Sequence, residues 1–186
     1  MPFIATNIQG LLVFEPKVFG DSRGYFFESY NAQVFEQEGV TTMFVQDNQS
    51  SSCYGVIRGL HYQLPPYAQA KLVRALYGTI LDVVVDIREG SPTFGQSYAI
   101  ELSAENKKQI FVPGGFAHGF SVLSEKAEIL YKCDTFYNKE SEGGIFYNDP
   151  KLAIDWKVPA DKVIVSDKDK VLPSLADCKN TFVFKD

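Results

Sequence analysis

The two histidines of this chain are the side chains best suited to move a proton near neutral pH. His61 and His118 are the only histidines among 186 residues. Arg58 precedes His61 by three positions, and Lys71 follows it by ten. An ordinary imidazole can act as a general base at cellular pH, and a cation beside it can stabilise the negative oxygen of an enolate. Composition alone favours a plainer interpretation. In it, His61 is a strand residue hydrogen-bonded to a neighbour, and Arg58 and Lys71 simply face water.

Arg58 and His61 can share a site only if the strand that carries them is irregular. In a regular strand, residues three positions apart point to opposite faces of the sheet. Gly59 lies between them and could permit a β-bulge, which inserts one extra residue. A bulge at Gly59 is therefore a requirement of any joint role for these two side chains.

Two tyrosines and two aspartates are further candidates for acid–base work. Tyr131 and Tyr137 have the same parity in AEILYKCDTFY, so one face of a strand over 127–137 would present both phenols. Core packing with the hydroxyls at a rim is the alternative. Asp167 and Asp169 lie in VSDKDKVLP, where we expect a polar turn with ordinary carboxylates.

Several common kinds of site are not expected. The sequence has no GxGxxG between a strand and a helix, no GxxxxGK[ST] and no GxSxG. Two isolated histidines do not form the usual metal site, which needs two or three imidazoles with a carboxylate. We therefore predict no metal and no cofactor. PGGFAHG, at 113–119, is predicted to be a tight turn between strands.

Charge and cysteine usage limit the partners and the compartment. The net charge is −5, from 18 basic and 23 acidic residues without a basic cluster, which argues against nucleic-acid binding. A small anionic ligand could still bind to a few converging cations. No apolar run is long enough to cross a bilayer, and we expect no membrane association. The three cysteines form no CxxC pair and the N-terminus lacks a secretory pattern, so a cytoplasmic location is predicted.

The elements that must position these residues are mostly short strands. TILDVVVDIR, at 79–88, alternates like a half-buried strand. Helix is expected at 31–39, capped by Asn31 and ended by Gly39, with another turn at 149–156 and a polar turn at 49–52. Many strands without alternating helices favour an antiparallel sandwich or jelly roll, formed by 1–186 as one domain. The other strand-like runs are near 26–30 and 43–49, and at 71–77, 96–103 and 127–137.

Seven segments occur together in an order that is typical of one family. They are GVIRGLHYQ, AKLVR, LDVVVDIREGSPTFG, VPGGFAHGF, ILYKCDTFY, EGGIFYNDP and SDKD. Because it carries these seven segments in this order, the chain resembles the dTDP-4-dehydrorhamnose 3,5-epimerases over nearly its whole length. The resemblance implies an all-β, cupin-like jelly-roll β-barrel with a few short helices, no cofactor, and a homodimer. It also implies inversion of carbons 3 and 5 of dTDP-4-dehydro-6-deoxy-D-glucose to give dTDP-4-dehydro-L-rhamnose, in dTDP-L-rhamnose biosynthesis.

The resemblance also implies roles for particular residues. His61 would be the base, oriented by Asp169, and Tyr131 would be the acid on the opposite face of the sugar. Lys71 would lie near the ketone oxygen, and Tyr137 would stack on thymine. The remaining substrate-binding positions implied by the family are Arg23, Glu28, Gln46, Asp47, Asn48, Arg58, His118, Glu142 and Lys168.

Inversion explains why two proton-transfer groups are needed. A proton that leaves one face of a carbon must return from the other, and a phenol, with an ordinary pKa of about 10, stays protonated until it is used. Three alternatives remain open at this stage. They are an epimerase of carbon 3 or carbon 5 alone, a non-catalytic sugar-binding cupin, and a metal-dependent cupin oxygenase.

Overall fold

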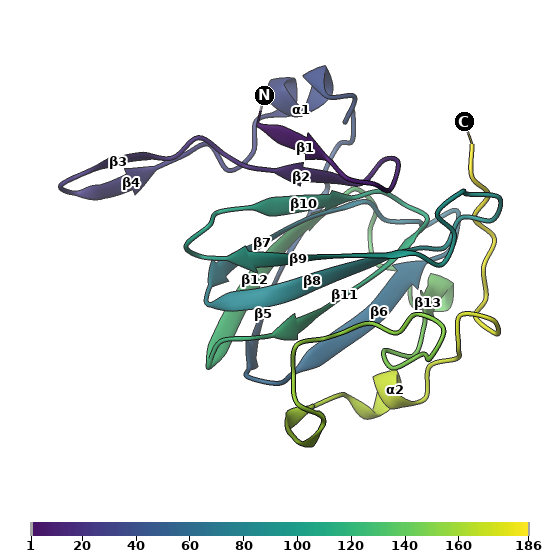
Figure 1. Cartoon of the computed structure of the whole chain (residues 1–186). Helices are drawn as coiled ribbons and strands as arrows, with labels where there is room; N and C mark the ends of the chain where they lie inside the picture. The colour runs from purple at the N-terminus through teal and green to yellow at the C-terminus, as the bar shows by residue number, and fades with distance from the viewer. Residues whose placement is uncertain (1, 186) are drawn as a thin grey trace.

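Two antiparallel sheets lie face to face in the computed structural model, which describes residues 2–185 (Figure 1). One sheet has the strand order β1-β2-β10-β7-β12-β5, and the other has the order β13-β6-β11-β8-β9. Successive strands from β5 to β8, and again from β10 to β13, alternate between the sheets. The predicted all-β, cupin-like jelly roll is confirmed. The strands are β1 (Phe3–Ala5), β2 (Leu12–Phe14), β3 (Phe19–Asp21), β4 (Gly24–Phe26), β5 (Gln46–Cys53), β6 (Ile57–Gln63), β7 (Lys71–Tyr77), β8 (Thr79–Asp86), β9 (Ser97–Ser103), β10 (Gln109–Val112), β11 (Phe116–Val122), β12 (Lys126–Cys133) and β13 (Glu142–Gly144).

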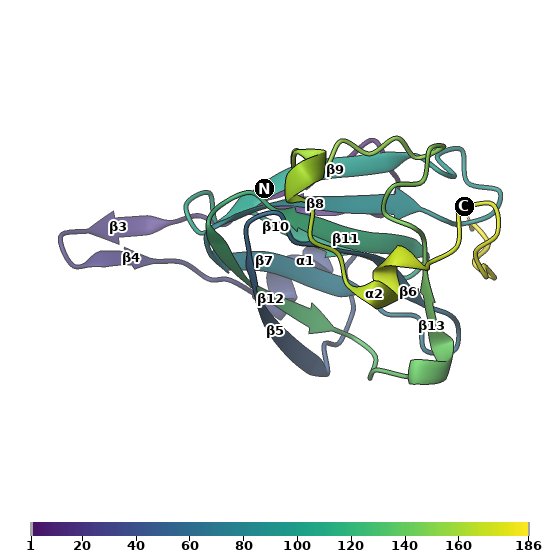
Figure 2. The ribbon, with the colours of Figure 1, turned by 90° about the horizontal axis from the view of Figure 1, so that it is seen from below.

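Strand β8 is buried on both faces, so the prediction of a half-buried strand at 79–88 is wrong. Ile80 and Val84 face the other sheet and belong to the cluster between the sheets. Val83 and Val85 point outward, where Trp156 and other residues of the C-terminal third cover them. Figure 2 shows this yellow-green segment running along the outside of β6, β8 and β11. Because a covering segment replaces water, the outward side chains of β8 can be apolar too.

The predicted helix at 31–39 is confirmed as α1 (Ala32–Gln37). The Asn31 side chain accepts a hydrogen bond from the main-chain N–H of Gln33 (3.1 Å), which satisfies a donor of the first turn. Gly39 follows with φ +81°, a conformation that favours glycine. Phe35 is completely buried against Phe14 on the outer face of the six-stranded sheet. The helix therefore covers part of the outer face of that sheet.

The other strand predictions differ in accuracy. The run at 71–77 coincides with β7, and the run at 96–103 coincides with β9 apart from its first residue. The turn predicted at 113–119 is confirmed only at 113–115, because residues 116–119 already belong to β11. The stretch at 49–52 is not a turn, because it continues β5 in register with β12. Of the run near 26–30, only Phe26 is in a strand. Residues 149–152 form a hydrogen-bonded turn, as expected.

The hairpin of β3 and β4 extends away from the two main sheets (Figures 1 and 2). Its aromatic side chains Phe19, Tyr25 and Phe26 are exposed. The remaining helices are short: α2 (Asp167–Lys170) and the 3₁₀ turns η1 (Lys139–Ser141) and η2 (Ala160–Lys162). None of the helices in residues 2–185 has the length and apolar character that a bilayer crossing requires.

Candidate active site

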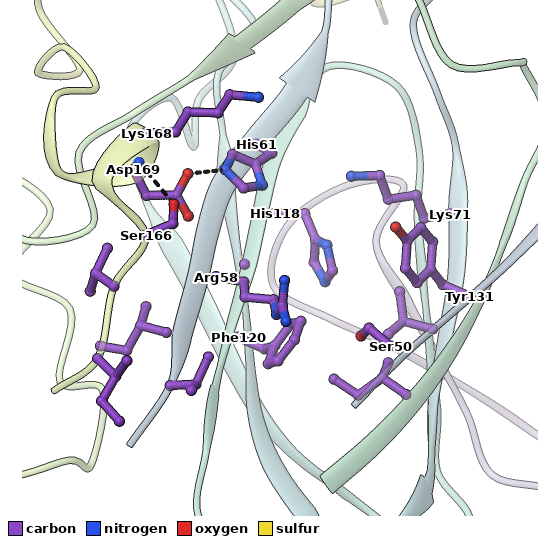
Figure 3. A pocket seen from close by; sticks show the side chains of 17 residues that line it. Ser50, Arg58, His61, Lys71, His118, Phe120, Tyr131, Ser166, Lys168 and Asp169 are labelled. Carbon is purple, nitrogen blue, oxygen red and sulfur yellow. Dashed lines mark hydrogen bonds and ion pairs between the residues drawn. The ribbon is translucent and has the colours of Figure 1, made fainter. Parts of the chain in front are cut away.

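A cavity of about 540 Å³ opens between the two sheets, and its walls carry the predicted acid–base residues. His61 on β6 comes from the five-stranded sheet. Lys71 on β7 and Tyr131 on β12 come from the six-stranded sheet. In Figure 3, the imidazole of His61 lies across the cavity from the phenol of Tyr131, and the Lys71 amine extends from the Tyr131 wall toward His61. The two proton-transfer candidates therefore face one cavity from opposite sides.

A β-bulge lets Arg58 and His61 point into the same cavity. His118 of β11 pairs with His61, and Phe120 pairs with Arg58, so two steps along β11 match three steps along β6. Gly59 has φ +121°, and a Cβ there would lie 2.6 Å from the Cα of Gly119. Only glycine fits this position without strain. The bulge required by the sequence argument is present.

His61 is hydrogen-bonded to a buried carboxylate. Its Nε2 lies 2.7 Å from Oδ1 of Asp169, whose side chain is almost fully buried. The other carboxylate oxygen of Asp169 accepts a hydrogen bond from the main-chain N–H of Gly59 (3.4 Å). Burial alone would raise the pKa of the Asp169 carboxyl, but the hydrogen bonds and the charge of His61 outweigh it and lower this pKa. Asp169 is therefore a carboxylate at neutral pH.

The segment that supplies Asp169 is one helical turn, so the prediction of a simple polar turn over 165–173 is wrong. Ser166 caps α2, and its Oγ accepts a hydrogen bond from the main-chain N–H of Asp169 (3.1 Å). Ser-x-x-Asp is a helix-start signature, which could have revealed this turn and the role of Ser166. Asp167 lies on the exposed side of the turn and pairs with Lys170 (2.8 Å). Of the two aspartates, only Asp169 faces the cavity.

Burial changes the proton affinity of both groups on the opposite wall. It lowers the pKa of the Lys71 amine, and the nearby Cys133 and Asp82 offset this only in part. It also raises the pKa of the Tyr131 phenol, to which Cys133 adds, whereas the positive charge of Arg58 acts in the opposite direction. Tyr131 therefore holds its proton at neutral pH. Burial therefore disfavours the charged Lys71 amine in the empty cavity, and an anion that forms beside it would favour the charged form and be attracted to it strongly.

A second His–Asp pair lies deeper in the five-stranded sheet. His118 Nε2 is 2.9 Å from Oδ2 of Asp82, which is completely buried. Oδ1 of Asp82 has no hydrogen-bond partner among residues 2–185. Asp82 is not among the residues predicted from the sequence, although an aspartate within an apolar strand run is itself a signal that its carboxylate is paired.

A second cavity, of about 380 Å³, adjoins the first and shares three of its residues, His61, Lys71 and Tyr131. Its other walls carry inward-facing side chains of β5 and, from elsewhere in the chain, Tyr62, Gln63, Gln69, Tyr137 and Glu142. The Lys168 amine, at the edge of the first cavity, is 2.7 Å and 2.8 Å from the Glu142 carboxylate oxygens. The two cavities therefore form one continuous site, large enough for a sugar and an attached group.

Comparison with known proteins identifies the family. The sequence model for dTDP-4-dehydrorhamnose 3,5-epimerase matches residues 5–177. The chain belongs to the dTDP-4-dehydrorhamnose 3,5-epimerase family. A family member from Shigella flexneri is 55% identical over 170 residues, which cover 91% of this chain and 93% of that protein. The resemblance drawn from the sequence motifs is confirmed.

Solved structures of epimerases agree with the fold. The crystal structure of a dTDP-4-dehydrorhamnose 3,5-epimerase from Elizabethkingia anophelis is 55% identical, with a TM-score of 0.90 over 94% of this chain and 96% of that chain. A dTDP-6-deoxy-D-glucose-3,5-epimerase from Legionella pneumophila, solved with dTDP-4-keto-L-rhamnose, is 51% identical, with a TM-score of 0.90. That alignment covers 94% of this chain and 93% of that chain.

Most of the site residues expected in this epimerase family member come together in the two cavities. The first cavity is lined by Arg58, His61, Lys71, His118, Tyr131, Lys168 and Asp169. The second adds Gln46, Asn48, Tyr137 and Glu142. Tyr137 reaches the site from a loop, because β12 ends at Cys133. The prediction that one strand face presents Tyr131 and Tyr137 is therefore wrong.

Three expected binding residues of this family member lie outside both cavities of the same chain. Arg23 is at the tip of the β3–β4 hairpin, paired with Asp21 (2.6 Å). Glu28 follows the hairpin and accepts a hydrogen bond from the side chain of Asn31 (3.3 Å). Asp47 points outward from β5 and pairs with Lys132 (3.0 Å). A single copy of the chain does not bring these three residues to the sugar cavity.

The described part of this epimerase, residues 2–185, has no group of three His, Cys, Asp or Glu side chains arranged to hold a metal ion. The two imidazoles each bond a different aspartate. The arrangement suits proton transfer by side chains.

Proposed function

We propose that this chain inverts carbons 3 and 5 of dTDP-4-dehydro-6-deoxy-D-glucose to give dTDP-4-dehydro-L-rhamnose, in the cytoplasmic synthesis of dTDP-L-rhamnose. The observation that supports this function best is the position of His61 and Tyr131 on opposite walls of one cavity with Lys71 in it. Removal and return of a proton on opposite faces of a ring needs this arrangement. We also propose that 1–186 forms a single domain that works without a cofactor.

His61 is suited to remove the proton next to the ketone. Because Asp169 is ionised, it can only accept a hydrogen bond, so the Nε2 atom of His61 must carry the hydrogen. The lone pair is then on Nδ1, which faces the cavity in Figure 3. Once His61 takes the sugar proton, the Asp169 carboxylate stabilises the resulting imidazolium.

Lys71 is suited to stabilise the enolate oxygen. Removal of the proton shifts negative charge to the oxygen of carbon 4, and a fixed cation can bind it without reorganisation. A single preorganised donor of this kind contributes on the order of 10²–10³ in rate. The ketone oxygen would therefore lie against the Lys71 amine, between the two walls.

Tyr131 is suited to return the proton from the other face. Burial keeps its phenol protonated until the enolate collapses. Arg58 favours the phenolate that forms, because its charge lowers the pKa of Tyr131. Each inversion therefore moves one proton to His61 and one from Tyr131, and both groups must exchange protons with water before the second carbon is inverted.

The second cavity is suited to the nucleotide. Tyr137 offers an exposed ring for stacking on thymine, and base–aromatic stacking contributes roughly 1–3 kcal/mol. Lys168 offers a cation to the diphosphate. Gln46 and Asn48 can bond polar groups of the same ligand.

We propose a homodimer in which the hairpin of one copy reaches the site of the other. The hairpin projects from the two main sheets with exposed aromatic side chains, which are typical of an interaction surface. A two-stranded hairpin without a packed face is only marginally stable by itself. A second copy would both cover the hairpin and bring Arg23 and Glu28 to a nucleotide.

The test is proton NMR of dTDP-4-dehydro-6-deoxy-D-glucose with the protein in heavy water. Deuterium at carbons 3 and 5, with conversion to the L-rhamno product, is expected. Label at a single carbon would identify an epimerase of that carbon alone. If dTDP binds but no label enters the sugar, the chain is a non-catalytic sugar-binding cupin and the proposal fails.

A further inference from the structure

The loop that carries Tyr137 is held in place by side chains from outside the loop. It runs from Asp134 to Asn138, between the end of β12 and η1. Phe136 and Tyr137 are 66% and 56% exposed, so packing does little to fix the Tyr137 ring. The direction of this ring depends on the main chain of the loop and on the hydrogen bond between its hydroxyl and Glu142.

Three glutamine side chains bond the main chain of this loop, which we call the nucleotide loop (Asp134–Asn138). Gln69 Nε2 donates to the carbonyl of Thr135 (2.6 Å). Gln46 Oε1 accepts from the N–H of Tyr137 (3.4 Å). Gln63 Oε1 accepts from the N–H of residue 138 (2.7 Å), and its Nε2 donates to the carbonyl of residue 136 (3.4 Å). The three glutamines come from β5, from the end of β6 and from the connection between β6 and β7.

Gln63 has the strongest hold on Tyr137 of the three. Its amide bonds the residues immediately before and after Tyr137, so it sets the main chain on both sides of the ring. Its Nε2 also donates to the carbonyl of Tyr67 (2.7 Å), which ties the amide to the β6–β7 connection. Gln63 is only 5% exposed, so water cannot easily replace these bonds.

We propose that Gln63 is a positioning residue for nucleotide binding, acting through Tyr137. This inference rests on the proposed function, in which Tyr137 stacks on thymine. A loop that is already ordered in the free protein avoids the ordering cost that binding otherwise carries. Gln63 would therefore strengthen nucleotide binding. Proton transfer would depend little on Gln63, because strand pairing holds His61 and Tyr131 in place.

The expected effect of Gln63→Ala is weaker dTDP binding. Loss of one such hydrogen-bonded anchor should raise the Kd for dTDP about 5- to 10-fold. The KM for the dTDP-sugar should rise by a similar factor, with a much smaller change in kcat. A general loss of structure would instead lower kcat as well.

The decisive experiment is a double-mutant cycle measured by calorimetry with dTDP on the full chain. The four proteins are the wild type, Gln63→Ala, Tyr137→Ala and the double variant. If Gln63 acts through Tyr137, Gln63→Ala should weaken binding in the wild type and have little further effect in Tyr137→Ala. Equal loss in both backgrounds would overturn the inference. A wild type that does not bind dTDP would instead refute the proposed function.

Two further variants separate positioning from stability. Gln63→Met keeps most of the side-chain volume but makes none of the hydrogen bonds of the amide, so a loss of dTDP affinity similar to that of Gln63→Ala is expected. This variant also carries the test if Gln63→Ala does not fold. Asn180→Ala is the matched control, because the Asn180 amide donates to the carbonyl of Ile87 and accepts from the N–H of Phe182 (3.0 Å), away from both cavities. Its melting temperature should fall without a change in dTDP affinity; an equal loss of affinity would overturn the inference.

Discussion

The two cavities of this protein are built from different kinds of structure. His61, Lys71 and Tyr131 are all on strands of the two sheets, and pairing with neighbouring strands fixes their main chain. Tyr137 is on a loop, and the ion pair of Glu142 and Lys168 joins the short strand β13 to the one-turn helix α2. Proton transfer tolerates little misplacement, whereas a flexible diphosphate sugar can bind to adjustable groups. The rigid region is therefore suited to chemistry and the looser region to recognition.

Because the two regions are built differently, substitutions in them should have separable effects on kcat and on dTDP affinity. Changes at His61, Lys71 and Tyr131 should lower kcat and leave dTDP affinity nearly intact. Changes in the nucleotide loop should weaken dTDP binding and leave kcat nearly unchanged.

The largest effect is expected for His61→Ala. General base catalysis contributes about 10²–10⁴ in rate, so deuterium exchange into the sugar should fall by at least this factor. Proton NMR in heavy water measures the rate of this exchange directly. Tyr131→Phe is the matched comparison, since it keeps the base and should allow exchange while blocking completed inversion.

Affinity for dTDP is the control for His61→Ala. It should stay within about threefold of the wild-type value, because the nucleotide groups are untouched. Near-normal turnover in His61→Ala would show that the base lies elsewhere and would remove the distinction between the two cavities.

Lys71→Met should lower kcat by about 10²–10³, the contribution of one oxyanion donor. Methionine retains much of the side-chain volume between the sheets but has no charge. Steady-state kinetics with the dTDP-sugar measure the change. An unchanged kcat with a raised KM would assign Lys71 to binding alone.

Tyr137→Ala should weaken dTDP binding roughly 5- to 150-fold, which corresponds to about 1–3 kcal/mol of stacking. Calorimetry with dTDP measures this loss. Tyr137→Phe keeps the ring and should bind nearly as well as the wild type. Equal weakening by both variants would mean that the hydroxyl, not the ring, contacts the ligand.

The smallest effect is expected in the pH dependence of stability. The folded state lowers the pKa of Asp169, so its ionised form stabilises the fold above the unfolded pKa of about 4. This contribution is lost as the pH falls through the folded pKa. Asp169→Asn should therefore cost on the order of 1 kcal/mol at pH 7, and the difference should shrink as the pH falls below about 4.

Urea unfolding of both proteins across this range of pH tests the prediction. A difference that is constant with pH would show that Asp169 stabilises the fold by packing and not by its charge. His61 also loses its orienting carboxylate in Asp169→Asn, so kcat should fall in the same variant.

The sequence alone determined the features that depend on neighbouring residues. The strand at 71–77 and the helix after Asn31 were predicted because side-chain periodicity and capping are local properties. The need for a bulge at Gly59 also follows from local geometry, since residues three apart on a strand diverge by simple alternation. The family motifs then indicated roles for His61 and Tyr131 that spacing alone could not assign.

Contacts between distant residues depend instead on how the two sheets and their covering segments pack. Asp169 lies 108 positions from His61, and the contact exists because α2 packs beside β6. Tyr137 leaves the face of Tyr131 because β12 and its partner β5 stop pairing at Cys133 and Gln46. The outer face of β8 is dry because the C-terminal third covers it. Each of these outcomes depends on how sheets close and which segments cover them, and local periodicity carries no information about either.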